Sequence, residues 1–334
     1  MSFDLPLAWA MLIGFGVFMY VLMDGFDLGI GVLFRFAPSD ADRDTMMNTV
    51  APIWDGNETW LVLGGSALFA VYPVAYAVIL SALYLPLIVM LVALIFRGVA
   101  FEFRFKAEKS RFLWDLAFNL GSTVAAFAQG VVLGAFIQGF QVTDGQYSGS
   151  ALAWATPFSL LTGLGIVAGY ALLGAGWIVL KAEGGLRDWA YRMVLRLTVA
   201  VLALMGAVSL WVPLLDARIA ERWFSWPNLA WLATVPLAVL AVAAMTLSAV
   251  RRRRDFVPFP CAVALFALGY LGLVISLFPN ILPPSISIWQ AASPPETQSF
   301  LIVGFCLVMP MVLAYTGYSY WVFRGKVTEA HYHH

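Results

Sequence analysis

The sequence has 334 residues, of which 62% are hydrophobic and only 11% are charged, and its mean hydropathy is +0.85. This composition is typical of a polytopic membrane protein, because soluble domains carry roughly 25% charged residues. The formal net charge of zero argues against a nucleic-acid partner. The first apolar run has no Lys or Arg before it, which argues against a cleaved signal peptide, so we expect the first helix to be retained.

Apolar runs of spanning length recur along the whole chain. In order, the nine predicted runs are Leu7–Phe36, Asn57–Val71, Val74–Phe103, Leu113–Phe140, Pro157–Leu180, Val194–Leu214, Leu229–Val250, Phe256–Phe278 and Gln298–Phe323. The second run is short, and Pro73 separates it from the third because proline breaks a helix interior. All the connections are short, so the sequence predicts an all-α polytopic membrane protein without a soluble domain.

The basic residues are distributed very unevenly between the predicted loops. With nine crossings, 17 of the 19 Lys and Arg residues fall on one side of the membrane, and only Arg218 and Arg222 fall on the other. Cytoplasmic loops carry an excess of Lys and Arg, so the C-terminus is predicted in the cytoplasm and the N-terminus outside. With eight crossings the later loops would exchange sides and the asymmetry would be lost. Arg251–Arg254 directly follows an apolar run and is interpreted as a topology anchor near anionic lipids.

Two carboxylates lie inside the first apolar run, in the stretch VLMDGFDLGIGVLFRF. An ionised Asp at the centre of a membrane helix costs about 2.5 to 3.5 kcal/mol, so Asp24 and Asp27 need a compensating use. Three residues apart, they lie about 60° apart on one helix face. Ion or proton handling is the first hypothesis. The alternative is that both acids only pair with a buried Arg or cap a kink.

A second polar site, APIWDGNETW, opens the second run, where Asp55 and Glu58 are three residues apart. Acids at a helix N-terminus also have a simpler explanation, since they cap free N–H groups and compensate the helix dipole. Arg97 lies near the cytoplasmic end of the third run. An unpaired guanidinium at that depth would be costly, which predicts an anionic partner, with snorkelling to the interface as the alternative.

Cysteine and histidine usage limits the cofactors that this chain can hold. Cys261 and Cys306 stand alone in apolar runs, without the spacing of an iron–sulfur site, and are interpreted as packing residues. The three histidines, His331, His333 and His334, lie in the last four residues. No intramembrane histidine is therefore present to ligate haem or a metal, and we expect this chain alone to bind neither.

Several motifs together closely resemble subunit II of the bd-type quinol oxidases, the cytochrome bd and cyanide-insensitive oxidase family. The most specific are MDGFDLGIGVLFRF (Met23–Phe36), NTVAPIWDGNETWLVLGGSALFAVYPVAY (Asn48–Tyr76) and IFRGVAFEFR (Ile95–Arg104). The later stretches SLFPNILPPSISIWQAAS (Ser276–Ser293) and LAYTGYSYWVFRGKVT (Leu313–Thr328) are similar to that family's last periplasmic connection and C-terminus. The resemblance covers the whole length, although residues 141–257 add little beyond a helix pattern.

The resemblance implies nine transmembrane helices arranged as two four-helix bundles plus one peripheral helix. The bundles would cover residues 1–141 and 142–280, and residues 281–334 would form the periplasmic connection, the ninth helix and a cytoplasmic tail. It also implies a heterodimer with a haem-bearing subunit I in the cytoplasmic (inner) membrane of a bacterium. In such a complex the b-type and d-type haems and the quinol site belong to subunit I. The complex oxidises quinol, reduces O2 to water and builds a proton gradient by vectorial chemistry.

The family's motifs carry specific roles to three residues. Asp27 in DGFDLG and Asp55 in WDGN match positions associated with a polar proton path, and Arg97 in FRGVAF matches the support of the haem-bearing interface. From this we expect a proton collected at Asp55 to move to Asp27, and Arg97 to meet a carboxylate or a haem propionate of the partner. Asp24 and Glu58 are weaker candidates, and Glu58 stands where relatives vary.

Two other functions compete with this interpretation. A stand-alone secondary transporter would bind a coupling ion at Asp24 and Asp27, but such transporters typically have a broken helix in each half, and the fifth run has no equivalent acids. A purely structural membrane scaffold would leave the buried acids unexplained. The sequence leaves open the quinone type, a small single-helix accessory subunit, and a quinone or lipid bound between helices.

Overall fold

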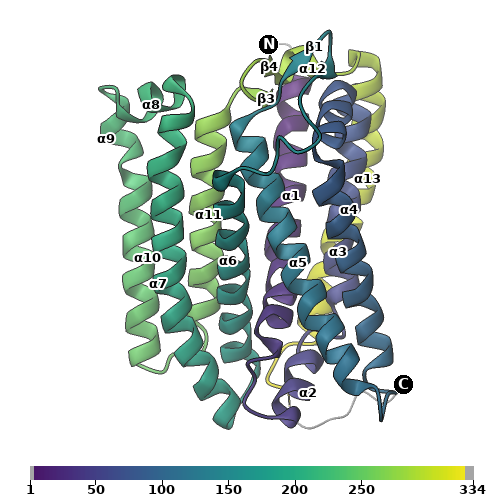
Figure 1. The fold of residues 1–334 in the computed structure, drawn as a ribbon, viewed down its shortest axis with the longest axis vertical. Coiled ribbons are helices and arrows are strands. Elements are labelled where there is room, and N and C mark those ends of the chain that lie inside the picture. Colours follow the sequence, from purple (N-terminus) through teal and green to yellow (C-terminus); the bar gives the residue numbers. More distant parts are fainter. Residues whose placement is uncertain (1–3, 328–334) are drawn as a thin grey trace.

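The computed structural model describes residues 4–327 and consists almost entirely of helices (Figure 1). Nine long helices are α1 (Leu5–Phe34), α3 (Trp54–Val71), α4 (Pro73–Phe103), α5 (Arg111–Gln138), α6 (Pro157–Lys181), α7 (Gly184–Leu215), α10 (Thr234–Arg251), α11 (Pro258–Leu277) and α13 (Pro295–Val322) in this part of the chain. Four short helices are α2 (Asp40–Asn48), α8 (Ala217–Phe224), α9 (Asn228–Leu232) and α12 (Ile288–Ala291). Two small antiparallel hairpins pair β1 (Val142–Thr143) with β2 (Gln146–Tyr147) and β3 (Asn280–Leu282) with β4 (Ile286–Ser287).

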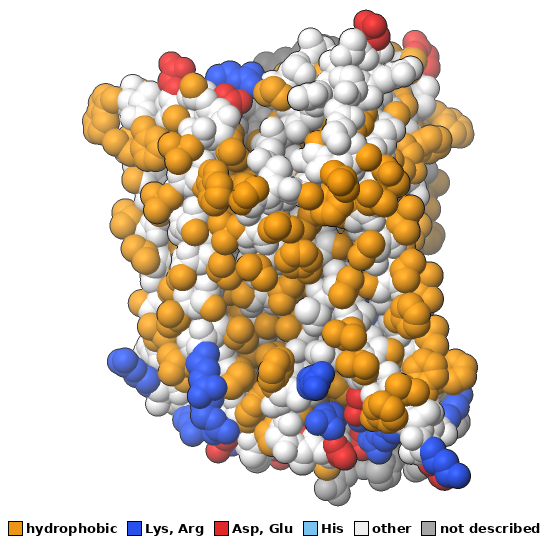
Figure 2. Space-filling view, viewed as in Figure 1, with side chains coloured by type: hydrophobic (Ala, Val, Ile, Leu, Met, Phe, Trp, Pro, Cys, Tyr) orange, Lys and Arg blue, Asp and Glu red, His pale blue; other side chains and the backbone are white. Residues whose placement is uncertain are grey.

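The long helices run between two ends of the molecule that differ in character (Figure 1). The hairpin end holds both hairpins, α8, α9 and α12, and the basic end holds α2. α1 begins at the hairpin end, and α13 ends at the basic end. Figure 2 shows Lys and Arg side chains gathered at the basic end, with hydrophobic side chains covering the space between the two ends. This separation follows the charge asymmetry found in the sequence.

Eight helical stretches of the described chain are long and apolar enough to span a membrane, by length and composition. They are α1, α4, α5, α6, α7, α11, α13 and the stretch Asn228–Arg251, which combines α9 and α10. The helix left out is α3, because its first turns carry Asp55 and Glu58. Its 18 residues give a length of about 27 Å, close to the thickness of the hydrocarbon core. The predicted break at Pro73 is confirmed, since α3 ends at Val71 and α4 begins at Pro73.

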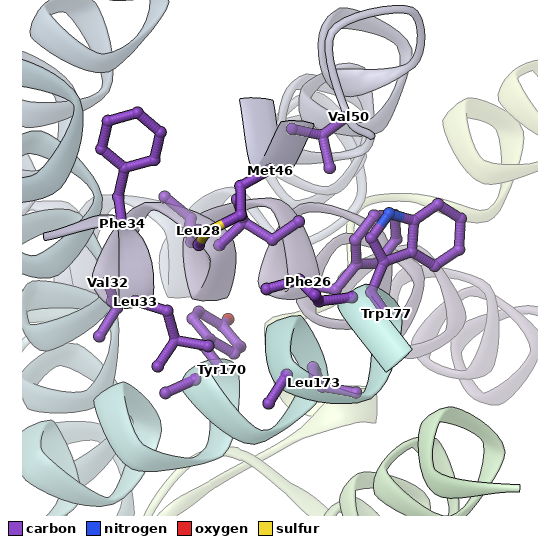
Figure 3. Close-up of a cluster of buried hydrophobic side chains, with 14 of the residues drawn as sticks. Phe26, Leu28, Val32, Leu33, Phe34, Met46, Val50, Tyr170, Leu173 and Trp177 are labelled. Atoms are coloured by element: carbon purple, nitrogen blue, oxygen red, sulfur yellow. The ribbon is translucent and has the colours of Figure 1, made fainter. Parts of the chain in front are cut away.

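The core forms around α1, which packs against α3, α5 and α6. A Cβ atom added to Gly29 would come within 1.8 Å of the Tyr170 carbonyl oxygen, so α1 and α6 meet backbone to backbone. Only glycine permits this approach, which is how small residues associate membrane helices. Around this contact Phe26 stacks on Trp177 with ring centroids 4.4 Å apart (Figure 3). The start of α6 is fixed by a capping box between Thr156 and Ser159.

α13 packs much less closely than the central helices. Of its residues, all of which are described, only Gln298 and Met309 are buried. The segment after α13 is tied to the basic end instead, where Lys326 Nζ donates hydrogen bonds to Asp255 Oδ2 at 2.6 Å and to the Ala182 carbonyl at 2.9 Å. Contacts at its ends therefore contribute much of the attachment of α13.

A charged clamp at the basic end joins α2 to α4 and α5. The buried Arg104 side chain donates to Asp44 at 2.6 Å and to Asp115 at 2.5 Å, and Arg111 also donates to Asp44. Partial burial opposes ionisation of Asp44, but the hydrogen bonds from Arg111 and Arg104 outweigh it and lower the pKa of that carboxyl. The clamp holds the α1–α3 connection over the end of the bundle.

Candidate functional site

Four charged side chains from three helices meet in the half of the bundle nearer the basic end. We call them the acid cluster: Asp24 and Asp27 from α1, Glu58 from α3 and Arg97 from α4. Arg97 Nη1 lies 2.7 Å from Asp24 Oδ1, Arg97 Nη2 lies 3.8 Å from Asp27 Oδ2, and Arg97 Nη1 lies 3.8 Å from Glu58 Oε2. The side chains of Asp24, Asp27 and Arg97 are at most 1% exposed in this chain.

Local packing explains how Arg97 reaches the two acids. On α1 the three-residue spacing keeps Asp24 and Asp27 on one face. Gly121 of α5 lets the α4 backbone come close, because a Cβ atom there would lie 3.0 Å from the Arg97 amide nitrogen. On its other side the guanidinium carbon lies 5.8 Å from the ring centroid of Trp54 and 5.9 Å from that of Phe101. The guanidinium is buried beside these rings, so its interactions with the neighbouring carboxylates are stronger than they would be in water.

Asp27 is held by an amide from α3. Asn57 Nδ2 donates to Asp27 Oδ2 at 2.8 Å and to the Met23 carbonyl at 3.3 Å. Asn57 Oδ1 in turn accepts a hydrogen bond of 2.9 Å from the Tyr320 hydroxyl of α13. Among the described residues, Asp27 Oδ1 has no hydrogen-bond partner. The two oxygens of this carboxyl group therefore lie in different surroundings.

A second polar chain leads away from Asp24 toward α5 and α6. Tyr20 lies one helical turn before Asp24, and its hydroxyl accepts a 2.7 Å hydrogen bond from Gln129 Nε2. The Tyr170 hydroxyl donates to Gln129 Oε1, also at 2.7 Å. Although Arg97 and Asp24 are close, none of the Arg97 N–H groups makes a hydrogen bond of good geometry within residues 4–327. Their contact is therefore an ion pair.

The structure brings together four of the five predicted site residues and leaves Asp55 apart. Asp55 is exposed in the first turn of α3, and its side chain has no ion pair with the described residues. Glu58, one turn further on, is the member of the acid cluster that reaches the surface, with 29% of its side chain exposed. Glu58, which the sequence indicated as a weaker candidate than Asp55, is thus the one of the two that lies next to Arg97.

Sequence reasoning missed the neutral members of the site. Asn57, Tyr20, Gln129 and Tyr320 are not among the predicted site residues. Their positions in the predicted apolar runs could have indicated them, because amides and tyrosines inside apolar helices need hydrogen-bond partners. Asn57 and Tyr320 also line a small cavity of about 20 Å³ between α3 and α13, which is large enough for one water molecule.

The described residues do not fit a haem or metal site. No histidine occurs among residues 4–327, and no three His, Cys, Asp or Glu side chains come together there in a way that would hold a metal ion. The acid cluster offers carboxylates and a guanidinium, a donor set unlike that of haem iron. Cys261 is buried and Cys306 is exposed, and both are free. The three histidines of the chain, His331, His333 and His334, lie outside the described residues.

The fold and the site define a multi-pass helical membrane protein with a buried carboxylate–guanidinium cluster, a class in which such groups serve ion or proton movement. The sequence profile of the family described as cytochrome bd terminal oxidase subunit II matches residues 5–323. The chain belongs to that family, which confirms the resemblance seen in its motifs.

Characterised relatives extend the same match over nearly the whole chain. Cytochrome bd-I ubiquinol oxidase subunit 2 of Escherichia coli K12 is 30% identical, over 96% of this chain and 94% of the relative. Cytochrome bd ubiquinol oxidase subunit 2 of Bacillus subtilis is also 30% identical, over 96% of both chains. In the solved structure of bd oxidase from Geobacillus thermodenitrificans, one chain aligns with a TM-score of 0.75 at 19% identity, covering 96% of this chain and 99% of that one. At this identity the structural match supports the fold.

Proposed function

We propose that this chain is the subunit of a membrane quinol oxidase that binds no haem itself, paired with a haem-bearing subunit I. The family and the names of the relatives support this proposal. The b-type and d-type haems and the quinol site would lie in the partner, where quinol is oxidised and O2 is reduced to water. This chain would stabilise the partner and bring it protons.

The acid cluster is the proposed proton path. One guanidinium balances one carboxylate, yet three acids surround Arg97, and an uncompensated buried charge is costly. The cluster therefore favours holding at least one proton. The observation that carries this proposal is the position of Glu58, which is partly exposed and also lies 3.8 Å from Arg97. It connects the surface to two fully buried acids.

The proposed route begins at Asp55, the exposed collector, and passes to Glu58 three residues later on α3. From Glu58 the proton reaches Asp27, whose Oδ1 atom has no hydrogen-bond partner among the described residues. Asp27 lies seven residues before the end of α1, about 10 Å from the basic end. Protons consumed by oxygen reduction would thus move from the basic end toward the middle of the membrane.

Arg97 has a proposed role inside this chain. By pairing with Asp24 it balances the charge of one carboxylate, and it thereby holds α1 and α4 in a fixed relation. Contact between Arg97 and a haem propionate of the partner stays a prediction. A stand-alone transporter is disfavoured, because the guanidinium occupies the position next to Asp24 and Asp27 that a coupling cation would need.

The proposed topology has nine crossings, with the basic end in the cytoplasm and the N-terminus outside. α1, α3, α4 and α5 would form the first four-helix bundle, and α6, α7, α10 and α11 the second. α13 would be the peripheral helix. The positive-inside rule supports this orientation, and the shallow burial of α13 supports its peripheral place.

The route can be tested with Asp27→Asn, Glu58→Gln and Asp55→Asn in the assembled oxidase. Variants with wild-type haem spectra would be placed in oriented proteoliposomes, and oxygen consumption and internal alkalinisation would be followed. Asp27→Asn should slow proton-coupled turnover about 10-fold or more, since proton transfer groups contribute factors of this order. Glu102→Gln is the matched control, because that acid is 70% exposed at the end of α4. Wild-type turnover in both Asp27→Asn and Glu58→Gln would refute the route.

A further inference from the structure

Tyr320 is a polar side chain of α13 that points into the bundle. Its ring packs against Trp177 and Phe26, with centroid distances of 6.1 and 6.4 Å. Its hydroxyl donates to Asn57 Oδ1 at 2.9 Å. Tyr318, two residues earlier, is 63% exposed and has no side-chain hydrogen bond to the described residues. Of the two tyrosines, therefore, only Tyr320 makes a side-chain hydrogen bond to the described residues.

The Tyr320 hydrogen bond decides which way the Asn57 amide faces. A side-chain amide has an oxygen that only accepts and a nitrogen that only donates. With Oδ1 accepting from Tyr320, both hydrogens of Nδ2 point to acceptors, the Met23 carbonyl and Asp27 Oδ2. If the amide were turned over, its oxygen would face these two oxygens and the hydroxyl of Tyr320 would lose its acceptor. Asn57 is only 2% exposed, so only the single water that fits the adjoining cavity is available, and one water does not replace all of these hydrogen bonds.

We infer that Tyr320 is a positioning residue for proton transfer, acting on Asp27 through Asn57. By fixing the amide it keeps Asp27 Oδ2 as a hydrogen-bond acceptor, so the proton is taken up and released at Oδ1. The last long helix thereby sets the proton affinity of a carboxyl group on the first. This inference rests on the proposed proton route through Asp27.

Other titratable groups also face Asp27 and bear on its titration. They are Asp24 from α1, Glu58 from α3 and Arg97 from α4, in addition to Tyr320 itself, while Tyr20 and Tyr170 lie near Asp24. The side chain that α5 contributes here, Gln129, is neutral. Replacing Tyr320 with phenylalanine leaves all the other groups in place and keeps the packing of the ring. A change in the titration of the site can then be assigned to the lost hydroxyl.

The test uses Tyr320→Phe in the complete oxidase, with Tyr318→Phe as the matched control. Loss of the fixed donor favours the protonated carboxyl, so the pH at which turnover is half-maximal should move up by about one unit. The KM for quinol should stay the same. Infrared difference spectra should show a shifted carboxyl C=O band, assigned as the band that Asp27→Asn removes. Tyr318→Phe should match the wild type in every measurement.

The outcomes separate this inference from the proposed function. A wild-type pH profile and carboxyl band in Tyr320→Phe would overturn the positioning role, even if Asp27→Asn is slow. Wild-type turnover in both Asp27→Asn and Glu58→Gln would overturn the proton route itself. If Tyr320→Phe assembles with too little haem, Asn57→Ala decides in the same assays, because it removes the same donor from Asp27. The alkaline shift in that variant supports the inference, and its absence overturns it.

Discussion

Replacing Arg97 with leucine removes the guanidinium that lies 2.7 Å from Asp24 and leaves a carboxylate buried without a counter-ion. Breaking a buried ion pair by removing one partner costs about 3 to 5 kcal/mol, because the remaining charge is neither paired nor solvated. The variant also loses the contacts of the guanidinium with the Trp54 and Phe101 rings. We expect Arg97→Leu to lower the thermal midpoint of the assembled complex by on the order of 10 °C and to reduce its haem content.

A double variant shows whether the lost stability comes from the unpaired charge. Arg97→Leu combined with Asp24→Leu removes both members of the pair, and apolar replacements of a buried pair are often neutral or stabilising. The double variant should therefore recover most of the thermal midpoint that the single variant loses. Thermal unfolding of the purified complex, followed by tryptophan fluorescence and by the haem bands, measures both. A double variant that is no more stable than Arg97→Leu alone would refute the ion-pair reasoning, as would wild-type stability of the single variant.

Gly29→Ala should prevent close contact of α1 with α6 and reduce expression of the folded complex severely, whereas Gly165→Ala, with no atom within 4 Å of the added Cβ, should change its thermal midpoint little. The pKa of Asp44 is lower in the folded state than in the unfolded state, so its stabilising effect is complete above about pH 4 and is lost as the pH falls through the folded pKa. Asp44→Asn should therefore be less stable at neutral pH and lose less stability on acidification, in unfolding curves measured from pH 7 to pH 3. Reporter fusions at Lys109 should be active in the cytoplasm and fusions at Asp144 outside, and the reverse pattern would contradict the proposed orientation.

Hydropathy predicted where the long helices lie, but it predicted the bounds of the short second run, Asn57–Val71, less well. The second predicted run begins at Asn57, but α3 begins at Trp54 in the structure. The difference arises because the polar turn that contains Asp55 and Glu58 is also helical. Helical hydrogen bonding satisfies the backbone there whatever the side chains are. The break at Pro73 was predictable from proline chemistry alone.

The candidate site was predicted as a set of charges, but not as a set of contacts. Asp24, Asp27 and Arg97 stand out because ionised groups are costly in a membrane helix. Their pairing depends on the position of α4 relative to α5, which the close contact at Gly121 fixes. The periodicity of the sequence does not report that position. The hydrogen bond between Asn57 and Tyr320 joins residues 263 positions apart, a contact that a single sequence does not encode locally.

The place of α13 in the chain has a consequence for biosynthesis. Translation proceeds from the N-terminus, so Asp24, Asp27, Glu58 and Arg97 all enter the membrane well before Tyr320 leaves the ribosome. The contact from Tyr320 to Asn57 therefore forms only after the final long helix has docked. A nascent or truncated chain would contain every acid of the cluster while lacking its last hydrogen-bond donor. The site is therefore complete only once α13 has been made, and a chain that stops before Tyr320 does not contain the finished site.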